Sequence, residues 1–289
     1  MTEMKINKLI VYAPAKINLG LEVTGKRPDG YHNLRTVFCQ VSLFDQLTIE
    51  EIDDGIVIQC DNPMIPVDER NTVYKAINIL KTKFDVKKGV KVSIKKEIPV
   101  EAGLGGGSSD AAAVLLGLNS LWELNLTNQK LIDIAVKIGA DVPYFILGKT
   151  QFAKGIGETL TELPAFSKKK LIVCVPKKRV NTKRAFELID SKRFVTNRQK
   201  MRFLLLALRE QNLNKVSRSL FNDFEEVILG KIPDINYIKK TMIKNGALGA
   251  VLTGSGSGVF GIFDNEKKRK RAFQVLKKEY KQTFLVETL

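Results

Sequence analysis

Four glycines fall within residues 103–107, and Ser108, Ser109 and Asp110 follow them directly. Glycine tolerates positive φ and close approach of other groups, so neighbouring glycines can turn several N–H groups toward one point. The alanine and leucine run that follows predicts a helix, whose start adds unpaired N–H donors and partial positive charge. Ser108 or Ser109 is a suitable N-cap, and either hydroxyl could instead bind a metal ion carried by a phosphate. The stretch favours a polyphosphate site, and the alternative is a capped glycine turn without a ligand.

Two common phosphate loops do not match this stretch. A Walker loop requires Lys and then Ser or Thr after its last glycine, whereas Ser108 and Ser109 follow Gly107. A dinucleotide fingerprint GxGxxG that begins at Gly103 would require a third glycine at Ser108. Both loops are excluded in their strict forms.

Three other residue types could carry chemistry. Asp141 lies between Gly139 and Pro143, where aspartate is also common as a plain turn residue. Lys16 lies in a strand-like segment, where it must face either solvent or a functional cleft, and Asn18 two residues later shares its face of the strand. His32 is the single histidine of the chain, and in its polar turn it is either a turn residue or a functional group.

Composition limits the class of protein. The chain has 289 residues, which is enough for two domains, and its 47 basic and 31 acidic residues give a net charge of +16. Such a charge attracts anions: nucleic acid, acidic membrane or phosphorylated small molecules. The basic cluster at residues 267–271 reads as a solvated helix face.

No membrane span or secretory signal is evident, so we expect a cytoplasmic protein. The spacing of Cys39, Cys60 and Cys174 predicts buried reduced thiols.

The elements that position these residues follow from periodicity. Alternating segments predict strands over 8–23, 35–51 and 89–98, and apolar spacing predicts helices from 71, after 109 and over 127–138. Residues 140–160 read as a turn limited by proline and then a strand. After a domain boundary placed near residue 160, we expect the strand LIVCV, mostly helical segments to Gly246, a β-turn-β unit over 249–263, a basic helix and a last strand.

Four segments resemble one family in sequence order. The pattern Pro-x-x-x-Gly-Leu-Gly-Gly-Gly-Ser-Ser-Asp, over residues 99–110, is similar to the phosphate loop of the GHMP kinases. PAKIN and DGYH, at residues 14–18 and 29–32, resemble the first motif of one branch of that family. GADVPYF at 139–145 resembles its catalytic segment, and LTGSGSGVF at 252–260 resembles the third GHMP motif. The combination of PAKIN with DGYH is more specific than the glycine loop.

The resemblance implies a fold and an activity. The fold class is α+β in two domains, with an ATP-binding N-terminal domain over 1–160, an α/β substrate-binding C-terminal domain over 161–289 and the active site between them. The activity is phosphorylation by ATP of the 2-hydroxyl of 4-diphosphocytidyl-2-C-methyl-D-erythritol, in the synthesis of isoprenoid precursors. ATP, Mg²⁺ and the cytidine diphosphate alcohol are the expected small molecules, with no nucleic acid or membrane partner, for a monomer or homodimer.

The resemblance also implies roles for residues. Asp141 takes the proton of the substrate hydroxyl, and Lys16 lies between that hydroxyl and the γ-phosphate. Tyr31 stacks on cytosine, His32 hydrogen-bonds it, and Phe186 is the other face of the stack, although Phe186 could equally be a core residue. The remaining substrate contacts are Asn18, Thr182, Gly254, Ser255 and Gly256. The ATP contacts are Gly103, Leu104, Gly105, Gly106, Gly107, Ser108, Ser109, Asn71 and Lys96, and Ser109 is also the metal ligand.

Two rival functions follow from the same residues. Another GHMP kinase, acting on mevalonate, homoserine or a sugar, would share the glycine loop but would not need Tyr31 and His32. A basic nucleic-acid-binding protein would use the lysine clusters without catalysis, but these clusters lack the interleaved aromatic residues of single-strand binders. Glu101 departs from the family pattern by placing a negative charge in the loop, and we expect its side chain to point away from the triphosphate.

Overall fold

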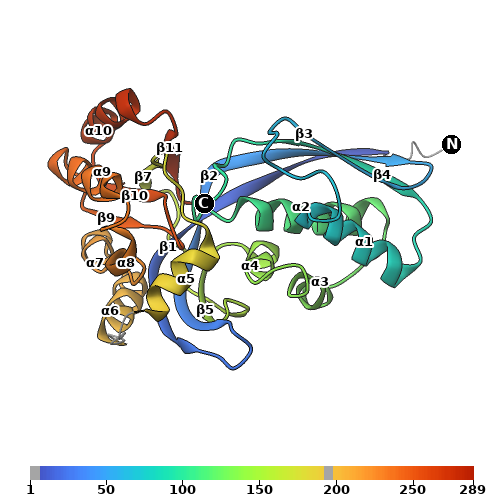
Figure 1. Cartoon of the computed structure of the whole chain (residues 1–289), viewed down its shortest axis with the longest axis horizontal. Coiled ribbons are helices and arrows are strands. Elements are labelled where there is room, and N and C mark those ends of the chain that lie inside the picture. Colours follow the sequence, from blue (N-terminus) through green and yellow to red (C-terminus); the bar gives the residue numbers. More distant parts are fainter. Residues whose placement is uncertain (1–6, 192–197) are drawn as a thin grey trace. The chain divides into compact units, whose positions relative to one another are not determined.

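The computed structural model describes residues 7–191 and 198–289 (Figure 1). These residues form two compact units, called unit 1 and unit 2 below. Unit 1 comprises Met1–Ala15, Phe44–Ile98 and Gly105–Leu147, and unit 2 comprises Lys16–Leu43, Pro99–Leu104 and Gly148–Leu289. This division differs from the single boundary near residue 160 that the sequence predicts. The physical reason is that the long strands β1 (Lys8–Lys26) and β2 (His32–Ile52) each contribute residues to both units.

Unit 1 is a layer of helices on a sheet. In the sheet, β4 pairs antiparallel with β2 from Gln46 to Ile52 and parallel with β3. Helix α2 packs closely on this sheet, since a Cβ at Gly117 would lie 2.6 Å from the Ile49 side chain. Figure 1 shows the helices of this unit on one face of its strands. The elements after β2 are β3 (Ile56–Cys60), α1 (Thr72–Phe84), β4 (Gly89–Lys95), α2 (Gly106–Leu121), α3 (Asn128–Ala135) and α4 (Val142–Leu147).

Two local predictions in unit 1 are wrong. The sequence favours a turn and then a strand over residues 140–160; the strand is present as β5 (Thr150–Gly155), but residues 142–147 form α4 where the turn was expected. Pro143 is compatible with a helix start, because the first-turn N–H groups need no intrahelical partner, and all the side chains from Val142 to Ile146 are buried, which erases the periodicity. The N-cap of α2 is Gly105 with φ 71°, so Ser108 and Ser109 lie inside the helix and do not cap it. The left-handed Gly105 takes that position because glycine has no Cβ to oppose it.

Unit 2 contains a second sheet in the order β11-β7-β10-β9, in which each neighbouring pair is antiparallel. The predicted β-turn-β unit is therefore confirmed as β9 and β10, which follow each other directly in this sheet. Helices α9 and α10 pack on these strands. In the same unit, β5 pairs with β2 and with β6, and β8 pairs with β1.

The bounds in unit 2 are β5 (Thr150–Gly155), β6 (Thr159–Glu162), β7 (Lys170–Cys174), α5 (Thr182–Asp190), α6 (Arg198–Arg209), α7 (Leu213–Arg218), β8 (Phe221–Asn222), α8 (Glu225–Ile228), α9 (Pro233–Lys244), β9 (Gly249–Leu252), β10 (Val259–Phe263), α10 (Glu266–Glu279) and β11 (Thr283–Glu287).

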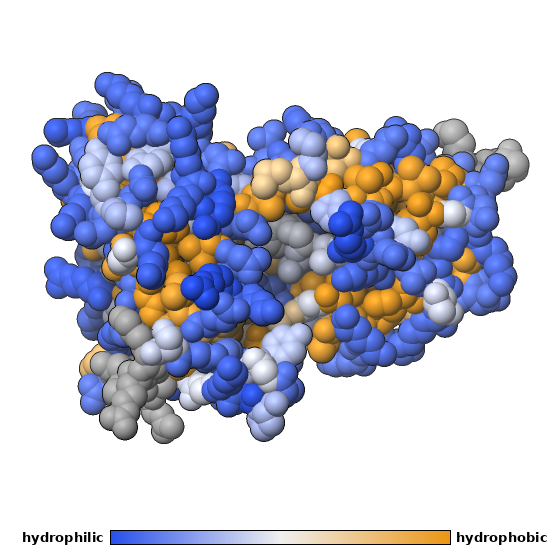
Figure 2. All heavy atoms as spheres, viewed as in Figure 1, coloured by the Kyte–Doolittle hydropathy of each residue, from blue (hydrophilic) through white to orange (hydrophobic). Residues whose placement is uncertain are grey.

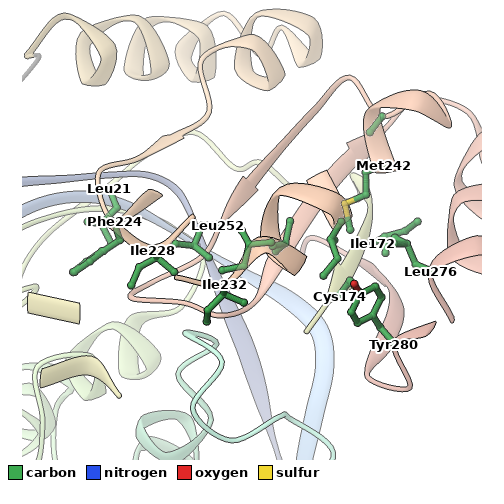
Figure 3. Close-up of a cluster of buried hydrophobic side chains, with 14 of the residues drawn as sticks. Leu21, Ile172, Cys174, Phe224, Ile228, Ile232, Met242, Leu252, Leu276 and Tyr280 are labelled. Atoms are coloured by element: carbon green, nitrogen blue, oxygen red, sulfur yellow. The ribbon is translucent and has the colours of Figure 1, made fainter. Parts of the chain in front are cut away.

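A hydrophobic core holds the elements of unit 2 together. Figure 3 shows buried side chains from α8, α9 and α10 meeting those of β7 and β9, for example Ile228, Met242 and Leu252. Full burial of one such side chain contributes about 1.5 to 3 kcal/mol. Phe186 of α5 is partly buried against this core. The core thereby fixes the helix on which several predicted site residues lie.

The basic cluster and the three cysteines can be compared with the predictions made from the sequence. On α10 the predicted basic cluster is solvated except for Arg269, which is buried, and hydrophilic side chains cover much of the face in Figure 2. Cys39 and Cys174 are buried free thiols, but Cys60 is partly exposed, so the prediction of burial is wrong for that residue. No helix of the described chain is both long and apolar enough to cross a membrane.

Candidate active site

In unit 1, the start of α2 gathers backbone donors. Gly105 and Gly106 lead into the helix, and Ser109 N–H is the donor to Gly105 O at 2.9 Å that closes its first turn. The N–H groups before Ser109 precede the first intrahelical bond, as at any helix N-terminus. Ser109 Oγ is buried and has no hydrogen-bond partner among the residues that the structure describes. An orphaned hydroxyl next to exposed helix donors suits an anion or an ion bound to one.

The start of α1 adjoins the start of α2. Asn71 is the N-cap of α1, and its Oδ1 accepts a hydrogen bond from Val73 N at 2.8 Å. Thr72, the first residue of α1, donates from Oγ1 to Gly107 O at 2.8 Å. Two helix N-termini therefore lie beside the same glycine, and their dipoles add positive potential there. The predicted ATP residue Asn71 is thus brought next to the glycine loop, with its side chain engaged as a cap.

A buried charge cluster lies under the loop. Lys96 Nζ is hydrogen-bonded to Asp45 Oδ2 and, at 2.8 Å, to Asp110 Oδ2, and all three side chains are at most 5% exposed. A Cβ at Gly106 would lie 3.2 Å from Lys96 Nζ, so a glycine permits this close packing. Burial raises the pKa of Asp110 to about 7, against the opposing charge of Lys96. The predicted ATP residue Lys96 therefore has its ammonium group committed inside the protein.

Asp141 directly precedes α4, in unit 1. It is partly exposed, whereas the next five residues are buried and fix its position. Val142 N donates to Gly139 O at 3.1 Å, which closes the turn that carries Asp141. The carboxylate is thus held on a short, anchored segment.

In unit 2, Lys16 and Asn18 share a face of β1, as their spacing predicts. Lys16 is 4% exposed and donates from Nζ to Asn18 Oδ1 at 2.7 Å. Asn18 Oδ1 also accepts hydrogen bonds from Gly254 N at 2.9 Å and from Thr253 Oγ1 at 3.2 Å. Asn18 therefore joins the predicted phosphoryl-contacting lysine to the loop of residues 253–258.

That loop is fixed by backbone contacts. Gly103 has φ 73°, and a Cβ there would overlap Thr253 O, so the first glycine of the phosphate motif packs directly on this loop. Gly258 N donates to Ala102 O at 3.0 Å, and Asn222 Nδ2 donates to Gly254 O at 2.8 Å. Ser255 Oγ lies 3.0 Å from Thr182 Oγ1, at the start of α5. The predicted substrate residues 254–256 and Thr182 are brought together.

Helix α5 then reaches His32. Phe186 stacks on the His32 ring with centroids 4.5 Å apart and an interplanar angle of 17°. One turn later, Asp190 Oδ1 lies 2.7 Å from His32 Nε2. Tyr31, next to His32, is 60% exposed and presents its ring to solvent. Phe186 thus packs on the core, which is one of the two roles considered from sequence, and it also contacts His32, while its stacking on the base stays a prediction.

Glu101 lies at the edge of this arrangement, in unit 2. It is exposed and has φ 52°, a left-handed conformation that glycine adopts more readily. Burial lowers the pKa of Arg179, and the negative charge of Glu101 opposes that effect. Glu101 therefore has a cation in reach, within its own unit.

Comparison with known proteins agrees with these motifs. The family model for the GHMP kinases N terminal domain matches residues 71–149, and the model for the GHMP kinases C terminal matches residues 204–282. A relative from Clostridium botulinum, named 4-diphosphocytidyl-2-C-methyl-D-erythritol kinase, is 39% identical over 96% of this chain and 99% of its own. The chain belongs to the GHMP kinase family. A relative of the same name from Clostridioides difficile is 43% identical over 95% of this chain and 93% of its own.

Solved structures extend the comparison to the fold. A crystal structure of 4-(cytidine 5'-diphospho)-2C-methyl-D-erythritol kinase matches with TM-score 0.80 and 31% identity, over 97% of this chain and 99% of that one. Homoserine kinase from Cytophaga hutchinsonii matches with TM-score 0.81 over 100% of this chain and 96% of that one, but at 20% identity. The second likeness shows the fold alone. The α+β GHMP fold predicted from the sequence is confirmed.

Sequence reasoning missed several residues of this GHMP kinase that support the predicted ones. Thr253 and Asn222 hold the 254–256 loop, and Asp190 holds His32. The spacing of Thr182, Phe186 and Asp190 is four residues each time, which places them on one helix face. That spacing was the available signal for Asp190.

Proposed function

We infer that the chain uses ATP to phosphorylate the 2-hydroxyl of 4-diphosphocytidyl-2-C-methyl-D-erythritol. The observation that carries this inference is the identity of 39 to 43% with enzymes of that name over nearly the whole chain. The crystal structure of an enzyme with the corresponding name, at 31% identity, supports the same activity. The product is the 2-phosphate, with ADP, in the synthesis of isoprenoid precursors.

The glycine loop is assigned to the triphosphate of ATP. Its donors are the backbone N–H groups at the start of α2, with the neighbouring N-terminus of α1 adding positive potential. Phosphate oxygens would replace water at these donors. The proposed ATP contacts in the loop are Gly103, Leu104, Gly105, Gly106, Gly107, Ser108 and Ser109.

We propose Asn71 and Lys96 as the contacts for adenine and ribose, although both side chains already have partners within the protein. The Asn71 amide caps α1, and the Lys96 ammonium is buried between two carboxylates. Both side chains are therefore already engaged within the protein, and contact with the nucleoside would use their remaining hydrogen-bonding capacity or backbone atoms.

Phosphoryl transfer requires alignment of the attacking hydroxyl and neutralisation of the moving phosphoryl group, with little covalent work by the protein. Asp141 is assigned as the acceptor of the hydroxyl proton, on its anchored turn before α4. Lys16 is assigned to the γ-phosphate and the hydroxyl, with its ammonium oriented by Asn18. A buried lysine with a fixed hydrogen bond contributes charge without reorganisation during the reaction.

The described residues offer one side-chain ligand for a magnesium ion bound to the phosphates. Ser109 Oγ is a buried hydroxyl without a partner among the described residues, and Mg²⁺ commonly keeps several waters and binds substrate phosphates with few protein ligands. Among those residues no group of three His, Cys, Asp or Glu side chains could hold a metal ion. We assign Ser109 as the protein ligand, and the bound ion would neutralise phosphate charge.

The cytidine end of the substrate is assigned to unit 2. Tyr31 is exposed, and we assign its ring to stack on cytosine. His32 follows Tyr31 in the sequence, and its ring stacks on that of Phe186, which lies on α5. Asn18, Thr182, Gly254, Ser255 and Gly256 are linked by the hydrogen bonds described above and are assigned to the rest of the alcohol. Aromatic and amide groups in one unit suit a nucleoside attached to a polar chain.

The setting of the reaction is also a proposal. The net charge of +16 favours polyanionic small molecules, and both substrates are of that kind. We propose a cytoplasmic enzyme, a monomer or homodimer, without a nucleic acid or membrane partner.

The test is product identification by ³¹P NMR after incubation with ATP, Mg²⁺ and the diphosphocytidyl alcohol. We expect one new phosphomonoester signal, coupled to the 2-position, for each ADP formed. Mevalonate and homoserine, offered in parallel, should give no product. ATP consumption with either of these and none with the diphosphocytidyl alcohol would reject the assignment.

A further inference from the structure

Asp190 is joined to two cationic or polar partners on β1 and β2. Its Oδ1 lies 2.7 Å from His32 Nε2, and its Oδ2 lies 2.6 Å from Lys26 Nζ. The hydrogen bonds from Lys26 and His32 lower the pKa of Asp190. An ionised carboxylate can only accept hydrogen bonds, so His32 Nε2 must be the donor in this pair.

The His32 ring is held in one orientation. Its side chain is 6% exposed, and Phe186 stacks on it from the preceding turn of the helix that carries Asp190. Phe186 is itself packed edge-on against Phe224, with ring centroids 5.0 Å apart. Ring rotation would therefore break both the stack and the short bond to Asp190. The orientation leaves Nδ1 as the ring nitrogen not engaged by the carboxylate.

In a neutral imidazole, one nitrogen donates and the other accepts. In the neutral ring with its proton on Nε2, Nδ1 is therefore the acceptor. Cytosine presents an amino donor at the 4-position, and uracil presents a carbonyl acceptor at the corresponding place. The Nδ1 acceptor can therefore bind the amino group of cytosine. With uracil, the lone pair of Nδ1 would face a lone pair of the carbonyl oxygen, and no hydrogen bond would form.

We propose that Asp190 is a positioning residue that fixes the proton of His32 on Nε2 and so makes the site select cytosine over uracil. This proposal rests on the proposed function, in which His32 binds the base. A buried acceptor left unpaired costs about 1 to 3 kcal/mol, which corresponds to a discrimination of about 5- to 150-fold. Asp190 acts through His32 and does not itself need to contact the substrate.

If Asp190 only stabilised the fold, its loss would not change the preference for cytosine over uracil. The Lys26–Asp190 ion pair is exposed on the Lys26 side, and exposed pairs contribute little to stability. Loss of a structural pair would lower activity with both bases equally. Loss of the fixed tautomer would change the ratio between them.

The first experiment compares kcat/KM for the diphosphocytidyl alcohol and for its diphosphouridyl analogue. We expect the unchanged enzyme to favour cytosine by at least about 5-fold. In Asp190→Asn the amide can accept from Nε2 or donate to it, so both tautomers are accessible and the ratio should fall toward one. Glu187→Gln is the matched control: it neutralises a carboxylate in an exposed ion pair on the same helix and should leave the ratio unchanged.

The second experiment observes the tautomer directly. The chain has one histidine, so protein labelled with ¹⁵N-histidine and purified without a polyhistidine tag gives a single imidazole spectrum. Two-bond ¹H–¹⁵N correlations should show the proton on Nε2 in the unchanged enzyme and a mixture in Asp190→Ala. This measurement needs no substrate, so it separates a failure of this proposal from a failure of the proposed function.

The outcomes are distinct. A proton on Nδ1 in the unchanged enzyme, or an unaltered cytosine-to-uracil ratio in Asp190→Asn, overturns the proposal. Absence of phosphorylation with either base, together with a proton on Nε2, overturns the proposed function instead.

Discussion

Replacing Lys96 by methionine removes the ammonium group that lies between the carboxylates of Asp45 and Asp110. Methionine fills a similar volume, so the change tests charge with little loss of packing. Asp45 keeps two backbone donors, since its Oδ1 accepts hydrogen bonds from Glu97 N at 2.7 Å and Ile98 N at 2.9 Å. Asp110 has no such support, because its Oδ1 is without a partner among the described residues. Asp110 is therefore the group that the variant leaves uncompensated.

The magnitude follows from burial. Removal of one partner from a buried ion pair costs about 3 to 5 kcal/mol. The cost depends on pH, because burial raises the pKa of Asp110 to about 7 even beside Lys96. The raised pKa gives stability that is full below the ordinary range of aspartate and is lost as pH rises through about 7. Without Lys96 the folded-state pKa rises further, so the deficit of the variant grows above pH 7.

We expect Lys96→Met to lower the free energy of unfolding by about 3 kcal/mol at pH 8 and by about 1 to 2 kcal/mol at pH 6. Urea unfolding at both pH values measures this difference. Lys95→Met is the matched control, since Lys95 is the neighbouring lysine of β4, is 65% exposed and pairs with Glu97 only at 3.7 Å. Its loss should stay below about 0.5 kcal/mol. Equal losses at the two pH values, or a loss as small as that of the control, would show that Lys96 does not compensate the buried charge of Asp110.

Three further changes test other parts of the molecule. Asp141→Ala should reduce kcat by about 10²- to 10⁴-fold while isothermal titration still shows ATP binding, and near-normal turnover would exclude Asp141 as the proton acceptor. Gly103→Ala should lower the free energy of unfolding by about 1 to 3 kcal/mol, because φ is 73° and the new Cβ would overlap Thr253 O; urea unfolding at wild-type stability would contradict the close packing. Burial raises the pKa of Asp223 to about 6, so its ionised form weakens the fold above that pH. Asp223→Asn keeps an acceptor for Val23 N and should be more stable than the unchanged chain by about 1 to 2 kcal/mol at pH 8 but not at pH 4; a stability difference that does not vary between these pH values in thermal unfolding would argue against the assignment.

Local signals predicted much of the fold. The apolar spacing of α1 and the β9–β10 hairpin are both set by residues near one another in the sequence. Helix α4 was missed because its side chains are buried on every side, which removes the periodicity that identifies a helix. The start of α2 was misassigned because Gly105, with positive φ, takes the cap that two serines could have taken.

The site shows a similar limit. The motifs identified the residues that carry the chemistry, but their supports depend on pairings between distant segments. Strand alternation places Lys96 on the same face as the buried Val92 and Ile94, but it does not identify the carboxylates that pair with it; Asp45 lies 51 residues away. Asp190 reads as a solvated charge near a helix end until His32, 158 residues away, is placed beside it. Such pairings follow from tertiary structure and cannot be read from one local pattern.

Recognition of the cytidine is tested by the ratio of kcat/KM for 4-diphosphocytidyl-2-C-methyl-D-erythritol to that for the same alcohol lacking its cytidine, with ATP in both reactions. We predict that ADP release depends on the cytidine and that its removal lowers kcat/KM by about 10²-fold or more, since stacking and hydrogen bonding to the base are lost. Equal kcat/KM for the two alcohols would contradict it.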